Sequence, residues 1–143
     1  MTDPLLDYHN DLPVELSPPD ITEYREGNSG VEYVQTMDSG KPGPHVLISA
    51  VVHGNELCGA IAADWLLKQA VKPVAGRLSV GFMNVEAYSS YDPNHPNRSR
   101  WVDEDFNRLW GPGLLVDPKR RITSELRRAR AVQPFLATVD LLL

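Results

Sequence analysis

The sequence predicts an α/β fold with a mixed, largely parallel sheet and flanking helices. The apolar run at residues 46–52 is short and β-branched, and its continuous apolarity is typical of a strand that is covered on both faces. A helical pattern at 57–69 and a second strand-like run at 78–83 follow it. Because this order implies a right-handed crossover to a parallel neighbour, residues 46–83 are predicted to form a βαβ unit.

The residues around this unit divide into an arm and the rest of one domain. Prolines interrupt the first 20 residues and predict an extended or poorly ordered arm over 1–20. Residues 21–24 and 31–36 are predicted to be short strands, because the turn-forming residues 27–30 separate them. Residues 21–143 are predicted to belong to a single domain.

A further helix is predicted over residues 117–137, with Pro118 in its first turn. Its apolar stripe at helical spacing comprises Ile122, Leu126, Ala129, Val132 and Leu136. Pro134 is expected to bend or end this helix. The basic residues of the segment, with Glu125 among them, are interpreted as a solvated helix face. The run that starts at Asp140-Leu141-Leu142-Leu143 predicts the first half of another strand.

Composition limits the classes of partner. The formal net charge of the 143 residues is −5, which argues against nucleic acid as a partner. The single cysteine, Cys58, excludes an internal disulfide, and a small buried core residue is its predicted role. No secretory signal and no apolar stretch of membrane-spanning length are visible. These features predict a cytoplasmic protein that binds neither nucleic acid nor a membrane.

The apolar run 46–52 stops abruptly at four polar or small residues, His53-Gly54-Asn55-Glu56. Asn55 is predicted to cap the helix at 57–69, which places Glu56 in its first turn. Because Gly54 permits a tight turn, the imidazole of His53 and the carboxylate of Glu56 can converge on one metal ion. The alternative is that both side chains pair with neighbouring polar groups and bind no metal.

The segment from Tyr91 to Pro112 is a long loop that carries arginine, aspartate and aromatic residues. Its aromatic and apolar side chains argue for an ordered loop that lies over the strand ends. Arginines in such a loop can hold an anionic substrate through bidentate hydrogen bonds. The alternative is a network of surface salt bridges without a ligand.

The two motifs His53-Gly54-Asn55-Glu56 and Asp105-Phe106-Asn107-Arg108 together resemble those of the succinylglutamate desuccinylase and aspartoacylase family, relatives of the zinc carboxypeptidases. The resemblance covers residues 43–143, with Phe106 in place of the usual leucine. It implies that His53 and Glu56 bind one zinc ion. By position it gives substrate binding to Arg100, Asn107 and Arg108, with Arg100 also acting in catalysis. Asp105 is expected to orient the loop rather than to touch the metal.

The resemblance implies hydrolysis of the amide bond of an N-acyl amino acid, a small anionic substrate, by metal-activated water. The family's third zinc ligand is a histidine in an Asp-x-His signature, and residues 139–143 resemble the approach to it without containing it. Residues 21–143 are therefore predicted to be the amino-terminal portion of a zinc-hydrolase domain, inactive alone and able to associate with another copy through an uncovered sheet edge. A zinc carboxypeptidase that acts on peptides and a metal-free binding module remain as alternatives.

Overall fold

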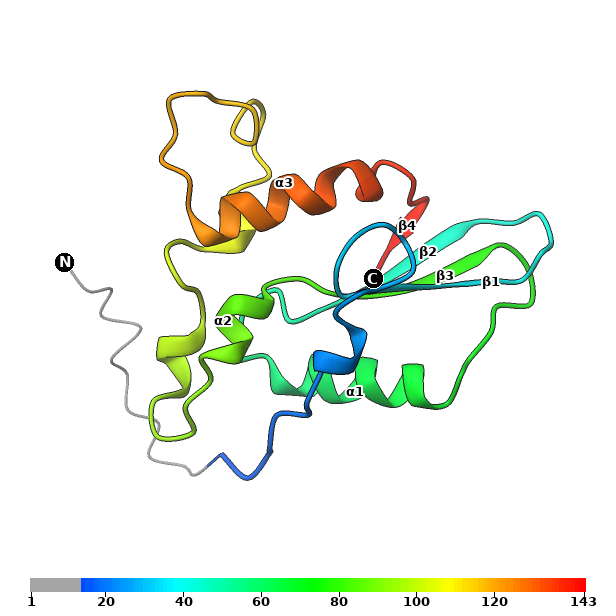
Figure 1. The fold of residues 1–143 in the computed structure, drawn as a ribbon, viewed down its shortest axis with the longest axis horizontal. Helices are drawn as coiled ribbons and strands as arrows, with labels where there is room; N and C mark the ends of the chain where they lie inside the picture. The colour runs from blue at the N-terminus through cyan, green and yellow to red at the C-terminus, as the bar shows by residue number, and fades with distance from the viewer. Residues whose placement is uncertain (1–13) are drawn as a thin grey trace.

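The computed structural model describes residues 14–143, so most of the predicted arm lies outside the described residues. Within them, a four-stranded sheet has the order β1-β3-β2-β4 (Figure 1). The strands are β1 (Val34–Asp38), β2 (His45–Ala50), β3 (Arg77–Phe82) and β4 (Leu141–Leu142). β2 pairs in parallel with β3 and with β4, and only β1 runs antiparallel to its neighbour β3. The predicted mixed, largely parallel sheet is confirmed.

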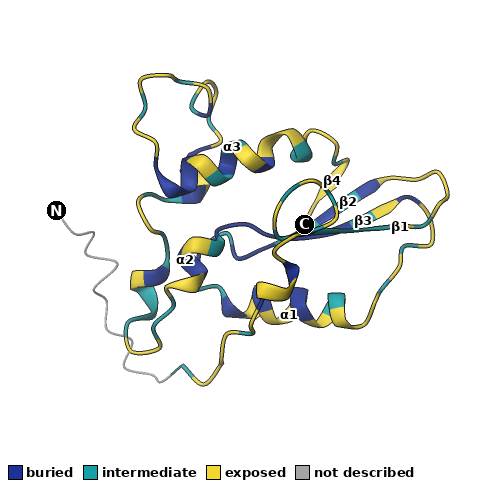
Figure 2. Cartoon of the chain, in the orientation of Figure 1, coloured by how far each residue is buried: buried dark blue, intermediate teal, exposed yellow. Residues whose placement is uncertain are grey.

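Helices cover both faces of this sheet. α1 (Leu57–Lys68) lies on one side and α3 (Ser124–Leu136) on the other, with the short α2 (Val85–Ser89) beyond the end of β3 (Figure 1). Each of the two longer helices closes a separate hydrophobic cluster, and the buried residues of both helices face the strands (Figure 2). Ile48 packs into the cluster under α1, whereas Leu47 belongs to the cluster under α3. Since neighbours in a strand point to opposite faces, β2 is buried on both sides, as its continuous apolarity predicts.

The predicted βαβ unit is confirmed, with small shifts at its boundaries. β2 ends at Ala50, and α1 crosses from its end to the start of the parallel β3. Val51 and Val52 therefore belong to the turn that follows β2, and Val51 adopts a φ of 59°. This left-handed conformation is unfavourable for a β-branched residue. The turn that carries His53 thus begins with a strained residue directly after the strand.

The strand predicted at residues 21–24 is wrong, because Thr22–Tyr24 forms a 3-10 helix. The carboxylate of Asp20 accepts hydrogen bonds from the backbone N–H and the hydroxyl of Thr22, at 2.9 and 2.7 Å. Such local side-chain bonds offer the backbone an alternative to a sheet ladder. The strand predicted at 31–36 exists but begins only at Val34, because the N–H of Val34 closes a turn onto the carbonyl of Val31.

The helix predicted at 117–137 begins seven residues late, at Ser124. Thr123 caps it, since its hydroxyl accepts a hydrogen bond from the N–H of Leu126 at 3.0 Å. Ile122 consequently lies outside the helix, is 57% exposed and does not belong to the apolar stripe. Pro134 lies inside the helix, which continues to Leu136.

Two expectations for α1 are also wrong. Asn55 does not cap the helix, because Glu56 occupies the N-cap position and makes no capping bond with its side chain. Cys58 is exposed rather than buried. Ile61 and Trp65, at 37% and 58% exposure, point away from the sheet, which α1 contacts through small residues such as Ala60 and Ala63.

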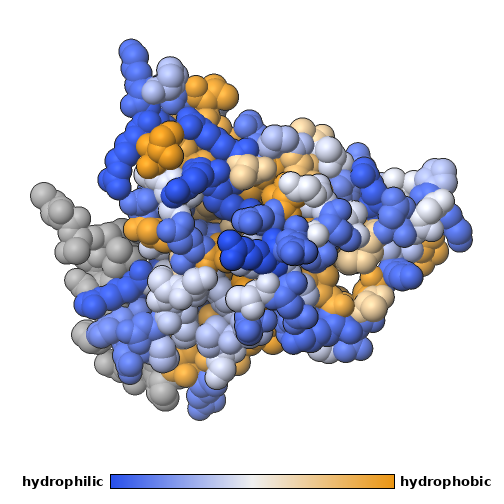
Figure 3. All heavy atoms as spheres, in the orientation of Figure 1, coloured by the Kyte–Doolittle hydropathy of each residue, from blue (hydrophilic) through white to orange (hydrophobic). Residues whose placement is uncertain are grey.

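The exposed apolar side chains do not merge into one large surface on the face drawn in Figure 3, where hydrophobic atoms appear in separate groups among hydrophilic ones. Scattered groups of this kind are normal for a protein surface. Among the described residues, no helix is long and apolar enough to cross a membrane.

A buried carboxylate in α1 gives the fold a pH-dependent contact. Asp64 accepts hydrogen bonds from the hydroxyl of Tyr24 at 2.7 Å and from the ammonium of Lys68 at 2.9 Å. Burial raises the pKa of Asp64, but the bonds from Lys68 and Tyr24 lower it by more than burial raises it. The net pKa therefore lies below its ordinary value. A depressed carboxyl pKa stabilises the fold above the pKa of the unfolded chain, and this stabilisation is lost as the pH falls through the folded pKa.

Asp64→Asn is therefore expected to lower the free energy of unfolding by about 1.5–3 kcal/mol at pH 7, the usual worth of hydrogen bonds to a charged group. The difference from the unsubstituted chain should shrink below about pH 4, where the unfolded carboxyl takes up its proton. Urea unfolding at pH 7 and pH 3 measures both values. Glu23→Gln is the control, because Glu23 is exposed and lies 4.0 Å from the same ammonium. A difference for Asp64→Asn that is independent of pH would contradict this account.

Candidate functional site

The turn after β2 brings His53 and Glu56 together. Nδ1 of His53 lies 2.7 Å from Oε1 of Glu56, and the backbone N–H of His53 donates to Oε2 at 3.1 Å. The side chain of His53 is only 5% exposed, whereas that of Glu56 is 42% exposed. An imidazole nitrogen and a carboxylate oxygen therefore meet at the carboxyl end of a buried parallel strand, where open α/β sheets place their ligands.

Gly54 packs this turn against the long loop. Its N–H donates to the carbonyl of Arg100 at 3.1 Å. A Cβ at this position would meet the carbonyl oxygen of Ser99 and the backbone of Ala87. Only glycine allows so close an approach of three backbone segments. The turn with the His53–Glu56 pair and the loop that follows α2 are thus held as one unit.

Asp105 contacts the other nitrogen of the same imidazole. Its Oδ1 lies 2.9 Å from Nε2 of His53 and also accepts from the N–H of Asn107 at 2.9 Å. Burial raises the pKa of the Asp105 carboxyl, but its bonds to His53 and Asn107 and the charge of Arg100 outweigh this, so the net pKa lies below its ordinary value. Each ring nitrogen of His53 therefore faces a carboxylate, Nε2 that of Asp105 and Nδ1 that of Glu56.

This donor set fits one zinc ion in part. Zinc in proteins binds imidazole nitrogen and carboxylate oxygen, and a ligating histidine commonly donates its other N–H to a carboxylate, as His53 does to Asp105. Residues 14–143 contain no group of three His, Cys, Asp or Glu side chains that could hold a metal. His45 lies at the opposite end of β2, where its ring contacts Thr138 and Ser79. Among the described residues, the structure thus brings together the two side chains that the sequence predicts as ligands, His53 and Glu56, and no third.

The loop between α2 and α3 is ordered, as predicted. It contains 3-10 turns at Pro96–Ser99 and Phe106–Arg108. Phe106 and Leu109 are 2% and 0% exposed and belong to the cluster under α3, and the rings of Phe106 and Trp110 meet edge to face at 5.5 Å. The buried apolar side chains anchor the loop, so the polar residues between them have defined positions.

The three arginine and asparagine residues predicted to bind substrate take different positions. The guanidinium of Arg100 lies 5.4 Å above the ring of Trp101, and that ring is 6.4 Å from the imidazole of His53. The charge of Arg100 also lowers the pKa of the Asp105 carboxyl that contacts His53, so this guanidinium lies within electrostatic reach of the pair. Asn107 follows Asp105 by two residues, and Arg108 is exposed one position further on.

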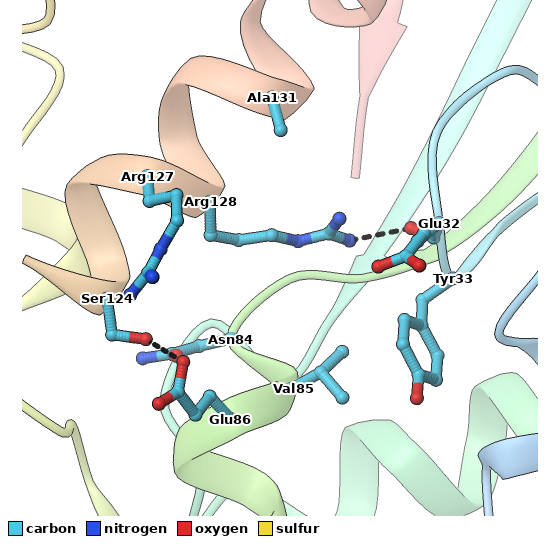
Figure 4. Close-up of a pocket in the computed structure, with 9 residues that line it drawn as sticks. All are labelled: Glu32, Tyr33, Asn84, Val85, Glu86, Ser124, Arg127, Arg128 and Ala131. Carbon is cyan, nitrogen blue, oxygen red and sulfur yellow. Dashed lines mark hydrogen bonds between the residues drawn. The ribbon is translucent and has the colours of Figure 1, made fainter.

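Two cavities lie on the α3 side of the molecule. A cavity of about 350 Å³ is lined mainly by apolar side chains and includes both Val52, which precedes His53, and Asn107. Another, of about 310 Å³, lies between α3 and the segment after β3 and includes Arg127 and Glu86 (Figure 4). The lining of neither cavity includes His53 or Glu56. Of the two, the cavity beside Asn107 is the one that is lined by a residue predicted to bind substrate.

Sequence reasoning misses one residue of this region, Glu125. The sequence pattern places it on a solvated face, but its side chain is fully buried. Its carboxylate accepts hydrogen bonds from the backbone of the loop at Val102, Asp103 and Glu104. In the sequence, Glu125 directly follows Thr123-Ser124, which is a typical helix start. That position indicates an acidic residue in the first turn of a helix, but it does not indicate which groups the carboxylate binds.

A model of the succinylglutamate desuccinylase/aspartoacylase catalytic domain matches residues 42–142. No curated protein and no solved structure matches the chain. The matched residues include the motif with His53 and Glu56, the motif from Asp105 to Arg108, and every strand except β1. The chain therefore belongs to the succinylglutamate desuccinylase/aspartoacylase catalytic-domain family, which is a family of hydrolases.

Proposed function

We propose that this chain contributes His53 and Glu56 to the zinc site of a hydrolase that cleaves the amide bond of an N-acyl amino acid. The observation that carries the proposal is the 2.7 Å approach of Nδ1 of His53 to Oε1 of Glu56. The contact of Asp105 with Nε2 on the far side of the same ring supports it. No third His, Cys, Asp or Glu side chain lies with this pair to form a group that could hold a metal among residues 14–143.

Each residue of the site would have a separate task. Bound zinc would supply a Lewis acid that lowers the pKa of a water molecule and polarises the amide carbonyl. Asp105 holds the imidazole of His53 by Nε2, so that Nδ1 stays available to the metal. Arg100, which lies within electrostatic reach of the pair, would stabilise the negative charge that develops on the carbonyl oxygen. Asn107 and Arg108 would bind the carboxylate of the amino acid.

A small anionic substrate suits these residues although the chain has a net charge of −5. The local field of a site matters more for a small ligand than net charge, and Arg100 and Arg108 lie on the same loop. We propose no nucleic-acid or membrane partner, and we retain a cytoplasmic location as a prediction. β4 is an edge strand of the described sheet, with Leu141 and Leu142 51% and 56% exposed, so the proposal includes association with a second copy.

Zinc binding is the first test. Zinc is expected to raise the thermal unfolding temperature of the chain, and His53→Ala and Glu56→Ala should each abolish this increase, because one ligand cannot replace two. His95→Ala is the matched control, since it removes an imidazole outside the pair. An absence of zinc uptake by the unsubstituted chain would contradict the proposal and favour a metal-free binding module. Loss of uptake in His95→Ala would identify a third ligand within the loop.

Substrate hydrolysis is the second test. With zinc, N-succinylglutamate and N-acylated aspartate are to be compared with a peptide library. We expect little turnover by this chain alone, because a site with two ligands holds the metal poorly. If turnover is found, it should be confined to N-acyl amino acids and should disappear in His53→Ala. Preferential cleavage of peptides would instead favour a zinc carboxypeptidase.

A further inference from the structure

Glu125 is the second residue of α3, and its carboxylate is enclosed by four N–H donors. Oε1 accepts from the backbone N–H of Val102 at 2.6 Å and from the side-chain amide of Asn84 at 3.2 Å. Oε2 accepts from the backbone N–H groups of Asp103 and Glu104 at 3.0 and 3.3 Å. Because its exposure is 0%, this carboxylate is hydrogen-bonded to protein groups, most of them in the loop backbone, and not to bulk water. Its position in the first turn of a helix also favours negative charge.

Two carboxylates of the loop also accept hydrogen bonds from the start of α3. Oδ2 of Asp103 accepts from the N–H of Ser124 at 2.9 Å, and Oε1 of Glu104 accepts from the hydroxyl of Thr123 at 2.5 Å. The same two acids pair with Arg121 and Arg120. Residues 102–104 and the first turn of α3 are therefore joined in both directions, which fixes the loop more firmly than any single bond.

Two short paths lead from Glu125 to His53. Along the loop, Glu104 is followed directly by Asp105, whose carboxylate contacts Nε2 of His53. Through Asn84, the side-chain amide contacts Glu125 while the backbone N–H donates to the carbonyl of Val51 at 2.8 Å, two residues before His53. Figure 4 shows Asn84 beneath the start of α3, beside Ser124 and Glu86.

We propose that Glu125 is a positioning residue for the metal site: through residues 102–104 it holds Asp105 against the imidazole of His53. Four donors share two oxygens, and glutamine in this place would present an amide group to donors that need an acceptor. A Glu125→Gln substitution therefore places an NH2 group where one oxygen stood, which loses the two bonds made there and opposes N–H to N–H, while the other oxygen still accepts. Only the consequence for zinc affinity depends on the proposed function, whereas the consequence for the His53–Asp105 contact does not.

The test uses Glu125→Gln, Asp105→Ala, their double variant and Val132→Ala. Val132 is the control, because it is fully buried on the same helix and belongs to the hydrophobic cluster under α3, but its side chain has no polar group to bond the loop. In the metal-free protein, NMR follows the exchange with water of the Nε2 proton of His53 and of the amides of residues 102–104. We expect exchange at least about tenfold faster in Glu125→Gln, since a charge-assisted bond is lost, and unchanged exchange of these groups in Val132→Ala.

Zinc affinity provides a second readout. Glu125→Gln should weaken zinc binding by about tenfold or more, as substitutions behind a metal ligand do. In the Asp105→Ala background the same substitution should weaken it no further, because Glu125 acts through Asp105. Additive losses, unchanged exchange in Glu125→Gln, or equal effects in Val132→Ala would each overturn the proposal.

The two readouts separate the proposals. If the unsubstituted chain takes up no zinc, the proposed function fails, and the exchange of the His53 proton still decides the role of Glu125. If Glu125→Gln does not fold, Glu125→Asp keeps the charge but withdraws the carboxylate from the loop. The Glu125→Asp variant must then show faster exchange with water of the Nε2 proton of His53 and of the amides of residues 102–104. Exchange rates like those of the unsubstituted chain would overturn the proposal.

Discussion

Gly54→Ala is expected to separate the turn that carries His53 from the loop that carries Asp105. The added Cβ would meet the carbonyl oxygen of Ser99 and backbone atoms of Ala87, which cannot rotate away as a flexible side chain would. Relief requires movement of the loop, and this would break the bond from the N–H of Gly54 to the carbonyl of Arg100. Overpacking of a core costs typically about 1–3 kcal/mol, and a backbone obstacle places this substitution at or above the upper value.

Urea unfolding and zinc titration measure this effect. We expect Gly54→Ala to lose about 3 kcal/mol of stability and most of the zinc affinity that we propose for the chain. Gly59→Ala is the matched control, because Gly59 lies in α1 and a Cβ added there would have ordinary contacts at 3.7–3.8 Å. Alanine there should stabilise the fold by about 0.5–1 kcal/mol, since glycine is unfavourable within a helix. Equal stability changes at the two positions would show that the close approach at Gly54 carries no cost.

The central part of the fold could be predicted because its cause is visible in the sequence. A strand buried on both faces needs continuous apolarity, and β2 has it between His45 and Ala50. The pairing of His53 with Glu56 follows from the same run, because both residues lie within four positions of each other across a turn. Their convergence therefore depends on local geometry, which a pattern of residue types can indicate.

The contacts that complete the site could not be predicted in this way. Nothing in the sequence pairs Asp105 with Nε2 of His53, since 52 residues separate them. Glu125 lies among arginines, a pattern that usually indicates a solvated face, and only the return of the loop onto α3 buries it. The late start of α3 has the same origin, because Thr123 caps the helix while it also binds Glu104 in the loop. Long-range contacts decided each of these positions.

The contacts of Arg128 also could not be predicted from the sequence, because they join distant segments. Substitution of Arg128 is expected to lower the free energy of unfolding more than substitution of any exposed arginine. Its guanidinium donates to the carbonyls of Met83 and Phe82, both at 2.8 Å, and of Glu32 at 2.9 Å. Figure 4 shows it crossing from α3 toward Glu32, whereas Arg127 points in another direction, toward Ser124. Burial lowers the pKa of Arg128 despite the charge of Glu32, yet the group remains charged because an arginine pKa starts so high.

Arg128→Met is therefore expected to lower the free energy of unfolding by about 3 kcal/mol or more, because three carbonyl groups lose a charged donor and a hydrogen bond to a charged group is worth about 1.5–3 kcal/mol. Arg128→Lys should recover little of this loss, since one ammonium cannot match the planar fork that reaches carbonyls from two segments. Arg127→Met is the matched control and should change stability by less than about 0.5 kcal/mol, as for other exposed substitutions. Chemical unfolding of the three variants measures these values, and full recovery by lysine would show that charge alone, and not the geometry of the fork, joins α3 to the end of β3.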